Sequence, residues 1–144
     1  MANVWKEVSA TWKGDLNFIG RNANGGSVCM DVAGDQPGIG PMELVLVGLA
    51  GCTGIDVASI LAKKKVALVD FKVNVRGKRA PSPPMVYTEI EVEYFLWGEN
   101  LKAKDVEQAI QLSEDKYCSV SVMLGKTAKI SSSYKIFKPD TSEA

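Results

Sequence analysis

The strongest constraint on this chain is the stretch from Pro41 to Lys65, PMELVLVGLAGCTGIDVASILAKKK, which is apolar nearly all the way round a helical wheel. A helix of this kind is buried in a protein core or in a bilayer. Crossing a bilayer takes about 20 apolar residues, whereas the charge-free run here extends only from Leu44 to Ile55. The stretch therefore predicts the central helix of a soluble protein rather than a membrane span.

Both ends of this stretch carry residues that favour helix termini. Pro41 suits the first turn, Glu43 suits the positive end of the helix dipole, and the lysines at 63–65 suit its negative end. Three glycines interrupt the helix at three-residue intervals: Gly48, Gly51 and Gly54. Each costs about 1 kcal/mol relative to alanine, and two explanations stay open. A second helix or a partner subunit packs closely against them, or they fit a cramped core.

Short strands are predicted on the N-terminal side of this helix, because apolar and polar residues alternate there with period two. The predicted order is a strand over 4–12, a turn at 13–15, a strand over 16–20, a turn at 22–26, a strand over 27–32 and a loop from Ala33 to Gly40. The first turn is Lys13-Gly14-Asp15, and the second is rich in glycine and asparagine, residues that turns generally favour.

Two longer strands are predicted after the helix, at 69–78 and 86–96, separated by the proline-rich segment Ala80 to Pro84. The first strand places lysine and arginine on one face, and the second places glutamates on one face (Glu89, Glu91 and Glu93). Opposite charges on facing strands indicate an antiparallel hairpin with cross-strand pairs. We interpret these charges as a solvated sheet face rather than a site.

Helical spacing returns between Asn100 and Tyr117, with one apolar stripe formed by Val106, Ala109, Ile110 and Tyr117. The segment 119–124 is open between a short helix stopped by Gly125 and a strand. A last strand is expected over 129–137, followed by a polar tail at 139–144 that frays. The whole order predicts one α+β domain over residues 1–144.

Composition excludes several classes of chemistry. The chain has no histidine, which removes histidine-activated nucleophiles and the common histidine-bearing metal sites. Basic and acidic residues both number 17, so charge gives no support for a nucleic-acid partner. The N-terminus lacks the apolar core of a signal peptide, and we expect a cytoplasmic location. In that compartment the three cysteines are expected to be free, catalytic or redox-active.

Cys52 and Cys118 are the candidate reactive residues. Each lies in or beside a predicted helix among small or hydroxyl neighbours, AGCTG and YCSVS. A thiolate is the reactive form, and a helix N-terminus or a nearby cation favours it. Buried cysteines also behave as inert small hydrophobes, and this alternative stays open for both residues. Cys29 lies on a predicted strand beside Met30, and we expect it in the core. Three scattered cysteines without CxxC spacing make a poor zinc motif, so no metal is expected.

Two of these segments carry a resemblance to a known family. GPMELVLVGLAGCTGIDVASILAKKK and, further on, LSEDKYCSVSVML resemble the OsmC/Ohr family of thiol-dependent peroxidases. ATWKGDLNF and GKRAPSPPMVYTEIEVEY fit the family more loosely. The resemblance spans nearly the whole chain, and its specific part is the two cysteines in their local contexts.

The resemblance implies an OsmC-like fold, with the order β-β-β-α-β-β-α-(α)-β, in an intertwined homodimer that has the long helix at its centre. It implies that Cys52 is the peroxidatic cysteine and Cys118 the resolving one, in a cycle of sulfenic acid and disulfide. Organic hydroperoxides are the implied substrates, with hydrogen peroxide poorer. The implied reductant is an external dithiol, lipoyl or thioredoxin-like, and no bound cofactor is expected. The implied role is an antioxidant one in the stress response.

Family members also hold an arginine against the peroxidatic thiolate, oriented by a glutamate early in the central helix. Arg21 and Glu43 are the candidates here, although family spacing puts the glutamate at Met42. Nine residues separate Glu43 from Cys52, which is half a turn out of phase on an ideal helix. Arg76 and Lys13 are substitutes for the arginine. Two other functions remain as alternatives: a non-enzymatic dimer that binds a small hydrophobic ligand, and a redox sensor of the same fold.

Overall fold

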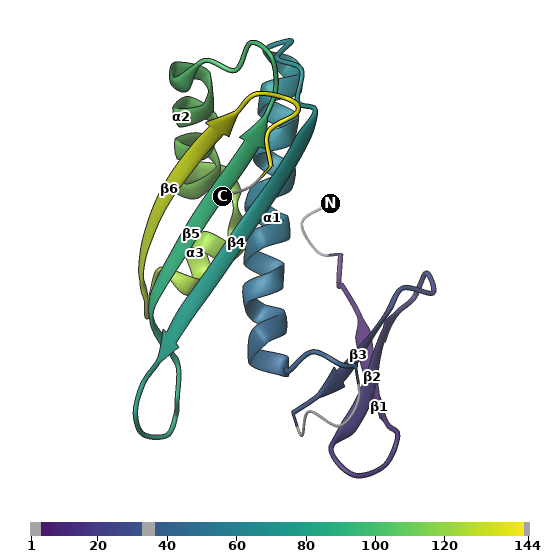
Figure 1. The fold of residues 1–144 in the computed structure, drawn as a ribbon. Coiled ribbons are helices and arrows are strands. Elements are labelled where there is room, and N and C mark those ends of the chain that lie inside the picture. The colour runs from purple at the N-terminus through teal and green to yellow at the C-terminus, as the bar shows by residue number, and fades with distance from the viewer. Residues whose placement is uncertain (1–3, 33–36, 143–144) are drawn as a thin grey trace. The chain divides into compact units, whose positions relative to one another are not determined.

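The computed structural model describes residues 4–32 and 37–142, which belong to two compact units, residues 1–45 and 46–144. The elements are β1 (Val8–Trp12), β2 (Asn17–Asn22), β3 (Ser27–Asp31), α1 (Pro41–Lys63), β4 (Asp70–Arg79), β5 (Tyr87–Trp97), α2 (Ala103–Leu112), η1 (Ser113–Tyr117), α3 (Ser119–Leu124) and β6 (Lys129–Phe137) (Figure 1). This order confirms the predicted α+β class. Part of the predicted loop, residues 33–36, and the last two residues of the tail lie outside the described residues.

The N-terminal unit is an antiparallel sheet in the order β1-β2-β3. Each of its two turns contains a glycine at positive φ, Gly14 at 107° and Gly25 at 91°, a region that residues with a Cβ rarely adopt. The first strand begins at Val8 rather than at Val4. Several apolar side chains of this sheet are exposed, among them Val8 and Trp12.

Helix α1 begins and ends with local hydrogen bonds that the sequence supports. The Glu43 carboxylate accepts a hydrogen bond of 2.8 Å from the Gly40 amide, as the glutamate of a capping box does. At the other end, the Val66 amide donates to the Leu61 carbonyl at 2.9 Å and the Lys65 amide donates to Ala62 at 3.0 Å. Lys65 has φ 60°, so the helix stops in a Schellman motif with a lysine in the left-handed position.

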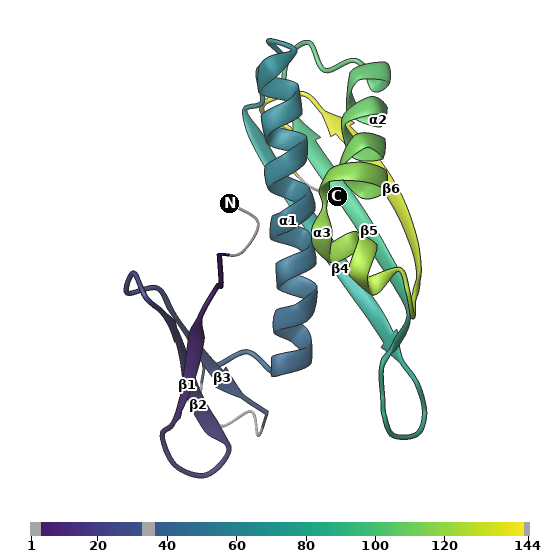
Figure 2. The same cartoon turned by 180° about the vertical axis from the view of Figure 1, so that it is seen from behind.

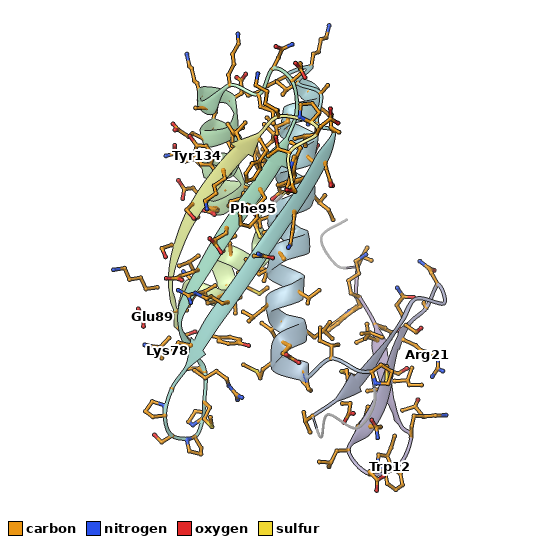
Figure 3. All side chains as sticks on the ribbon, viewed as in Figure 1. Trp12, Arg21, Lys78, Glu89, Phe95 and Tyr134 are labelled. Carbon is orange, nitrogen blue, oxygen red and sulfur yellow. The ribbon has the colours of Figure 1, made fainter. Side chains whose placement is uncertain are left out.

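The second sheet has the order β4-β5-β6, with β4 antiparallel and β6 parallel to the central strand β5. The predicted hairpin is confirmed, since Arg76 lies opposite Glu91 and Lys78 lies opposite Glu89. Arg76 forms an ion pair with Glu91, and the Lys78 Nζ is 3.4 Å from a Glu89 oxygen (Figure 3). Exposed pairs of this kind contribute at most about 1 kcal/mol each, so the apolar face carries the stability.

Helices α1 and α2 lie on one face of this sheet (Figure 2). The side of α1 toward the sheet is formed by buried residues at four-residue intervals: Leu49, Thr53, Val57 and Leu61. The inward side chains of the central strand are buried as well: Ile90, Val92, Tyr94 and Leu96. From α2, Val106 and Ala109 are fully buried in the same unit. The main core therefore lies between the β4–β6 sheet and its helices.

The other side of α1 is apolar and open. Val47 is 50% exposed and Ile55 is 71% exposed. A Cβ added at Gly48 or Gly51 meets no described atom within 4 Å, whereas one at Gly54 meets Val73 at 3.5 Å. The cramped-core explanation is therefore wrong for Gly48 and Gly51. The other explanation, close packing of a second helix or a partner subunit, stays open for these two glycines.

By length and composition alone, α1 is the one candidate membrane span among the described residues, and 22% of its most apolar window is buried. The core helix of a soluble protein passes the same test. The side of α1 that carries Leu49, Val57 and Leu61 is already occupied by the sheet.

A π-helical turn, η1, corrects the predicted stripe of the second helical segment. The Cys118 amide donates to the Ser113 carbonyl at 2.7 Å, five residues back. This wider turn shifts the phase of the helix. Tyr117, predicted on the buried stripe, is 52% exposed, and Cys118 is 0% exposed instead. The segment left open at 119–124 is the helix α3.

Candidate active site

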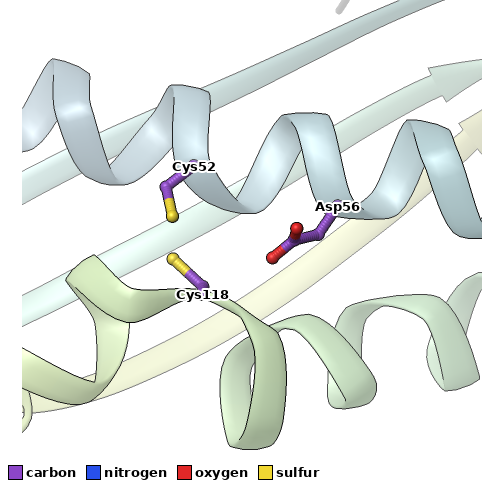
Figure 4. A group of neighbouring side chains, drawn as sticks. All are labelled: Cys52, Asp56 and Cys118. Carbon is purple, nitrogen blue, oxygen red and sulfur yellow. The ribbon is translucent and has the colours of Figure 1, made fainter. Parts of the chain in front are cut away.

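Two thiols and a carboxylate meet inside the second unit (Figure 4). The Sγ atoms of Cys52 and Cys118 and a carboxylate oxygen of Asp56 all lie within 4.8 Å of one another. Cys52 and Asp56 are one turn apart on α1, so they share a side of the helix. Cys118 comes from the junction of η1 and α3. The two cysteines chosen from the sequence are thus brought together from positions far apart in the chain.

The π-helical turn is what directs Cys118 inward. It brings the thiol, rather than the ring of Tyr117, to the buried side of the segment. Cys118 is then the N-cap of α3, and its Sγ accepts a hydrogen bond of 3.3 Å from the Ser121 amide. Turns of this type are frequent at functional sites.

Burial makes the two thiols unequal. Cys118 is completely buried, whereas Cys52 is half-buried. Burial first, and then the hydrogen bond with Cys52, raises the pKa of Cys118 to about 12. At neutral pH Cys118 is therefore a thiol and a poor nucleophile. The more accessible Cys52 is the better placed of the two to attack an entering molecule.

A chain of hydrogen bonds leads away from the site through the core. The Ser113 hydroxyl donates to Asp56 at 2.9 Å and lies 2.9 Å from the Thr53 hydroxyl. Thr53 in turn lies 2.7 Å from the Tyr94 hydroxyl, which donates to Glu114 at 2.6 Å. Burial, and then the Glu114 hydrogen bond, raises the pKa of Tyr94 well above its usual value. Ser113, Thr53 and Tyr94 are thus buried with their hydroxyls satisfied, which fixes the Asp56 carboxylate in place.

The other predicted site residues belong to the N-terminal unit. Arg21 is an exposed residue of β2 and lines an apolar depression of about 650 Å³ together with Leu44 of the first turn of α1. Glu43 caps α1 through Gly40. Their approach to Cys52 stays a prediction.

Arg76, the alternative to Arg21 as the cation beside Cys52, cannot reach the Cys52 thiol of the same chain. It alternates with Val73 and Val75, whose face of β4 is turned toward the helices, and it binds Glu91 on the opposite face. It therefore points away from the face of the sheet on which α1 lies. Lys13 is exposed beside the first turn of the N-terminal sheet.

The expectation for Cys29 is wrong. Alternation along β3 puts Val28 and Met30 on the more buried face, so Cys29 falls on the exposed one. Sequence reasoning also missed Asp56. The sequence could have indicated Asp56, because an acidic residue four positions after Cys52 in an apolar helix lies on the same side of the helix as the cysteine.

Comparison with known proteins identifies the family. Residues 34–133 match the family model described as OsmC-like protein. The protein YhfA of Escherichia coli K12 is 38% identical over 125 residues, which cover 87% of this chain and 93% of YhfA. The chain belongs to the OsmC-like family.

Solved structures share the fold. A hypothetical protein of Aquifex aeolicus VF5 has a TM-score of 0.84 and 33% identity, covering 94% of this chain and 98% of that one. A Legionella pneumophila protein described as the organic hydroperoxide resistance protein OsmC has a TM-score of 0.70 at 14% identity, covering 94% and 99%. These matches include nearly all of this chain, so α1 is the central helix of an OsmC-like fold and not a membrane span. The cytoplasmic location stays a prediction.

Proposed function

We propose that this protein is a thiol-dependent peroxidase that reduces organic hydroperoxides through Cys52 and Cys118. The observation that carries the proposal is the juxtaposition of a half-buried and a fully buried thiol in one site. Membership of the OsmC-like family supports a redox role, and a structural neighbour carries hydroperoxide resistance in its name.

The reaction balances with these two residues and an external dithiol. The Cys52 thiolate attacks the O–O bond and becomes a sulfenic acid, and the departing alkoxide takes a proton to leave as an alcohol. The Cys118 thiol then condenses with the sulfenic acid, which forms a disulfide and releases water. A lipoyl or thioredoxin-like dithiol reduces the disulfide by exchange.

The surroundings of Cys52 favour apolar substrates. On a helix surface its neighbours include Gly48 and Ile55, four residues before and three after it. Gly48 leaves open space, and Ile55 offers an exposed apolar side chain. An alkyl or aryl group bound there is removed from water at about 25 cal/mol per Å² of buried apolar surface.

We expect kcat/KM for cumene hydroperoxide to exceed that for hydrogen peroxide by about tenfold or more, because burial of one aryl group stabilises by more than 1.4 kcal/mol. The measurement is steady-state peroxide consumption with dihydrolipoamide as the reductant. Consumption no faster than with dihydrolipoamide alone contradicts the proposed function.

Arg21 is proposed as the cation that activates Cys52, with Glu43 orienting it. Arg21→Ala is expected to slow the oxidation of Cys52 by about tenfold or more, since an adjacent cation favours a thiolate. Arg76→Ala is the matched control, because Arg76 lies on the far face of the sheet, and its rate is expected to match wild type. Stopped-flow thiol oxidation measures both, and equal rates in the two variants contradict the role of Arg21.

A homodimer is the proposed assembly. The open side of α1, with Val47 and Gly51, presents the kind of apolar surface that partner chains cover. A small residue there allows a second helix to approach closely. Sedimentation equilibrium is expected to give the mass of two chains, and the mass of one chain contradicts the assembly.

A further inference from the structure

The geometry points to a second use of the same cluster: Cys52, Asp56 and Cys118 form a binding site for a zinc ion, occupied when both thiols are reduced. This inference goes beyond the proposed peroxidase and does not require it. It rests on the three ligand groups themselves, which no step of the peroxide chemistry needs together.

The spacing fits the ion. All three ligand atoms lie within 4.8 Å of one another. Zinc binds thiolate sulfur at about 2.3 Å in a tetrahedron, which sets two sulfurs about 3.8 Å apart. Side-chain adjustments of about 1 Å or less are therefore enough. Three protein ligands leave the fourth position for water, as in zinc sites that stay open to small molecules.

The ligand types select the metal. Two sulfurs and one carboxylate suit a thiophilic ion such as zinc, whereas calcium and magnesium prefer oxygen alone. When the two thiols give up their protons on binding, two thiolates and a carboxylate hold the divalent ion.

Hydrogen bonds around the cluster hold two of the ligands in place. Ser113 donates to one oxygen of Asp56 at 2.9 Å, and the Ser121 amide donates to the Cys118 sulfur at 3.3 Å. Outer contacts of this kind orient metal ligands and commonly change affinity by about 10–100-fold. Ser113 is itself fixed by Thr53 at 2.9 Å.

Metal binding and disulfide formation exclude each other. Binding of zinc displaces the protons of the two thiols into solvent. Oxidation by a hydroperoxide converts the two thiolate sulfurs to a disulfide and reduces the hydroperoxide to an alcohol and water, with two protons taken back from solvent. Asp56 is then the sole remaining ligand. The ion is then released, so the site couples zinc binding to the redox state of the pair.

The test is titration of the reduced wild-type protein with cobalt(II) as a spectroscopic probe, followed by zinc competition against a chromogenic chelator. We expect one ion per chain, a sulfur-to-cobalt charge-transfer band and the strong visible bands of a tetrahedral ion. Cys52→Ser and Cys118→Ser are each expected to lose much of the charge-transfer intensity. Asp56→Asn, which keeps the side chain's shape, is expected to weaken zinc binding by at least about tenfold.

Two variants serve as matched controls. Asp115→Asn changes an exposed carboxylate of η1, and Cys29→Ser changes the exposed thiol of β3, and both are expected to bind zinc as wild type does. A cobalt spectrum without the charge-transfer band, or equal zinc affinity in Asp56→Asn and wild type, overturns the inference. Zinc binding in a protein that fails to consume hydroperoxide leaves this inference standing and contradicts the peroxidase alone.

Discussion

Cys52→Ser is expected to lower the rate of hydroperoxide consumption by about a thousandfold or more, to the level of the dithiol alone, because removing a nucleophile removes the first chemical step. Cys118→Ser is expected to behave differently. Its Cys52 still reacts once, so about one equivalent of hydroperoxide disappears, but the sulfenic acid then has no partner thiol. Remaining hydroperoxide, measured by a ferrous-iron colour assay in the absence of small thiols, separates a stalled single turnover from no reaction.

The matched control is Cys29→Ser, since Cys29 is an exposed cysteine on another element. Its turnover is expected to equal that of wild type. The serine variants at 52 and 118 retain side chains of nearly the same size, and their circular dichroism is expected to match wild type. Turnover at the wild-type rate in both site variants contradicts the proposed chemistry.

Leu61→Ala is expected to lower the free energy of unfolding by about 2–5 kcal/mol, because it deletes buried methyl groups and leaves a cavity. Leu61 is 0% exposed and belongs to the side of α1 that carries Leu49 and Val57. The measurement is urea unfolding followed by circular dichroism.

Leu61→Met provides the control at the same position. It preserves volume and apolar character, so its cost is expected to stay below about 1.5 kcal/mol. If Leu61→Ala cost no more than Leu61→Met, α1 would not be held to the sheet by its buried face.

Most of the fold could be predicted because apolar periodicity sets which face of each element is buried. The charge alternation of β4 and β5 was enough to predict an antiparallel hairpin, although not its register, which places Arg76 opposite Glu91. The parallel pairing of β5 with β6 was not predictable from periodicity, since it depends on how the intervening helices cross over the sheet.

The misses in the site have physical causes too. The π-helical turn includes a hydrogen bond from the Cys118 amide to the Ser113 carbonyl, and the change of phase puts Cys118 rather than Tyr117 at the buried position. Asp56 accepts a hydrogen bond from Ser113, 57 positions away in sequence. This contact could not be predicted from the sequence of α1 alone. Cys52 and Cys118 were chosen as a pair from their local contexts, and the structure brings their sulfurs within 4.8 Å of each other; their reactivity stays a prediction.

The central claim is that Cys52 and Cys118 form a working redox couple. One equivalent of cumene hydroperoxide added to the reduced protein tests it, with the rate of thiol loss followed first and the product then mapped by peptide mass spectrometry. We predict rapid loss of two thiols per chain and a disulfide that joins Cys52 to Cys118. Slow oxidation spread over all three cysteines, without that bridge, would contradict the account.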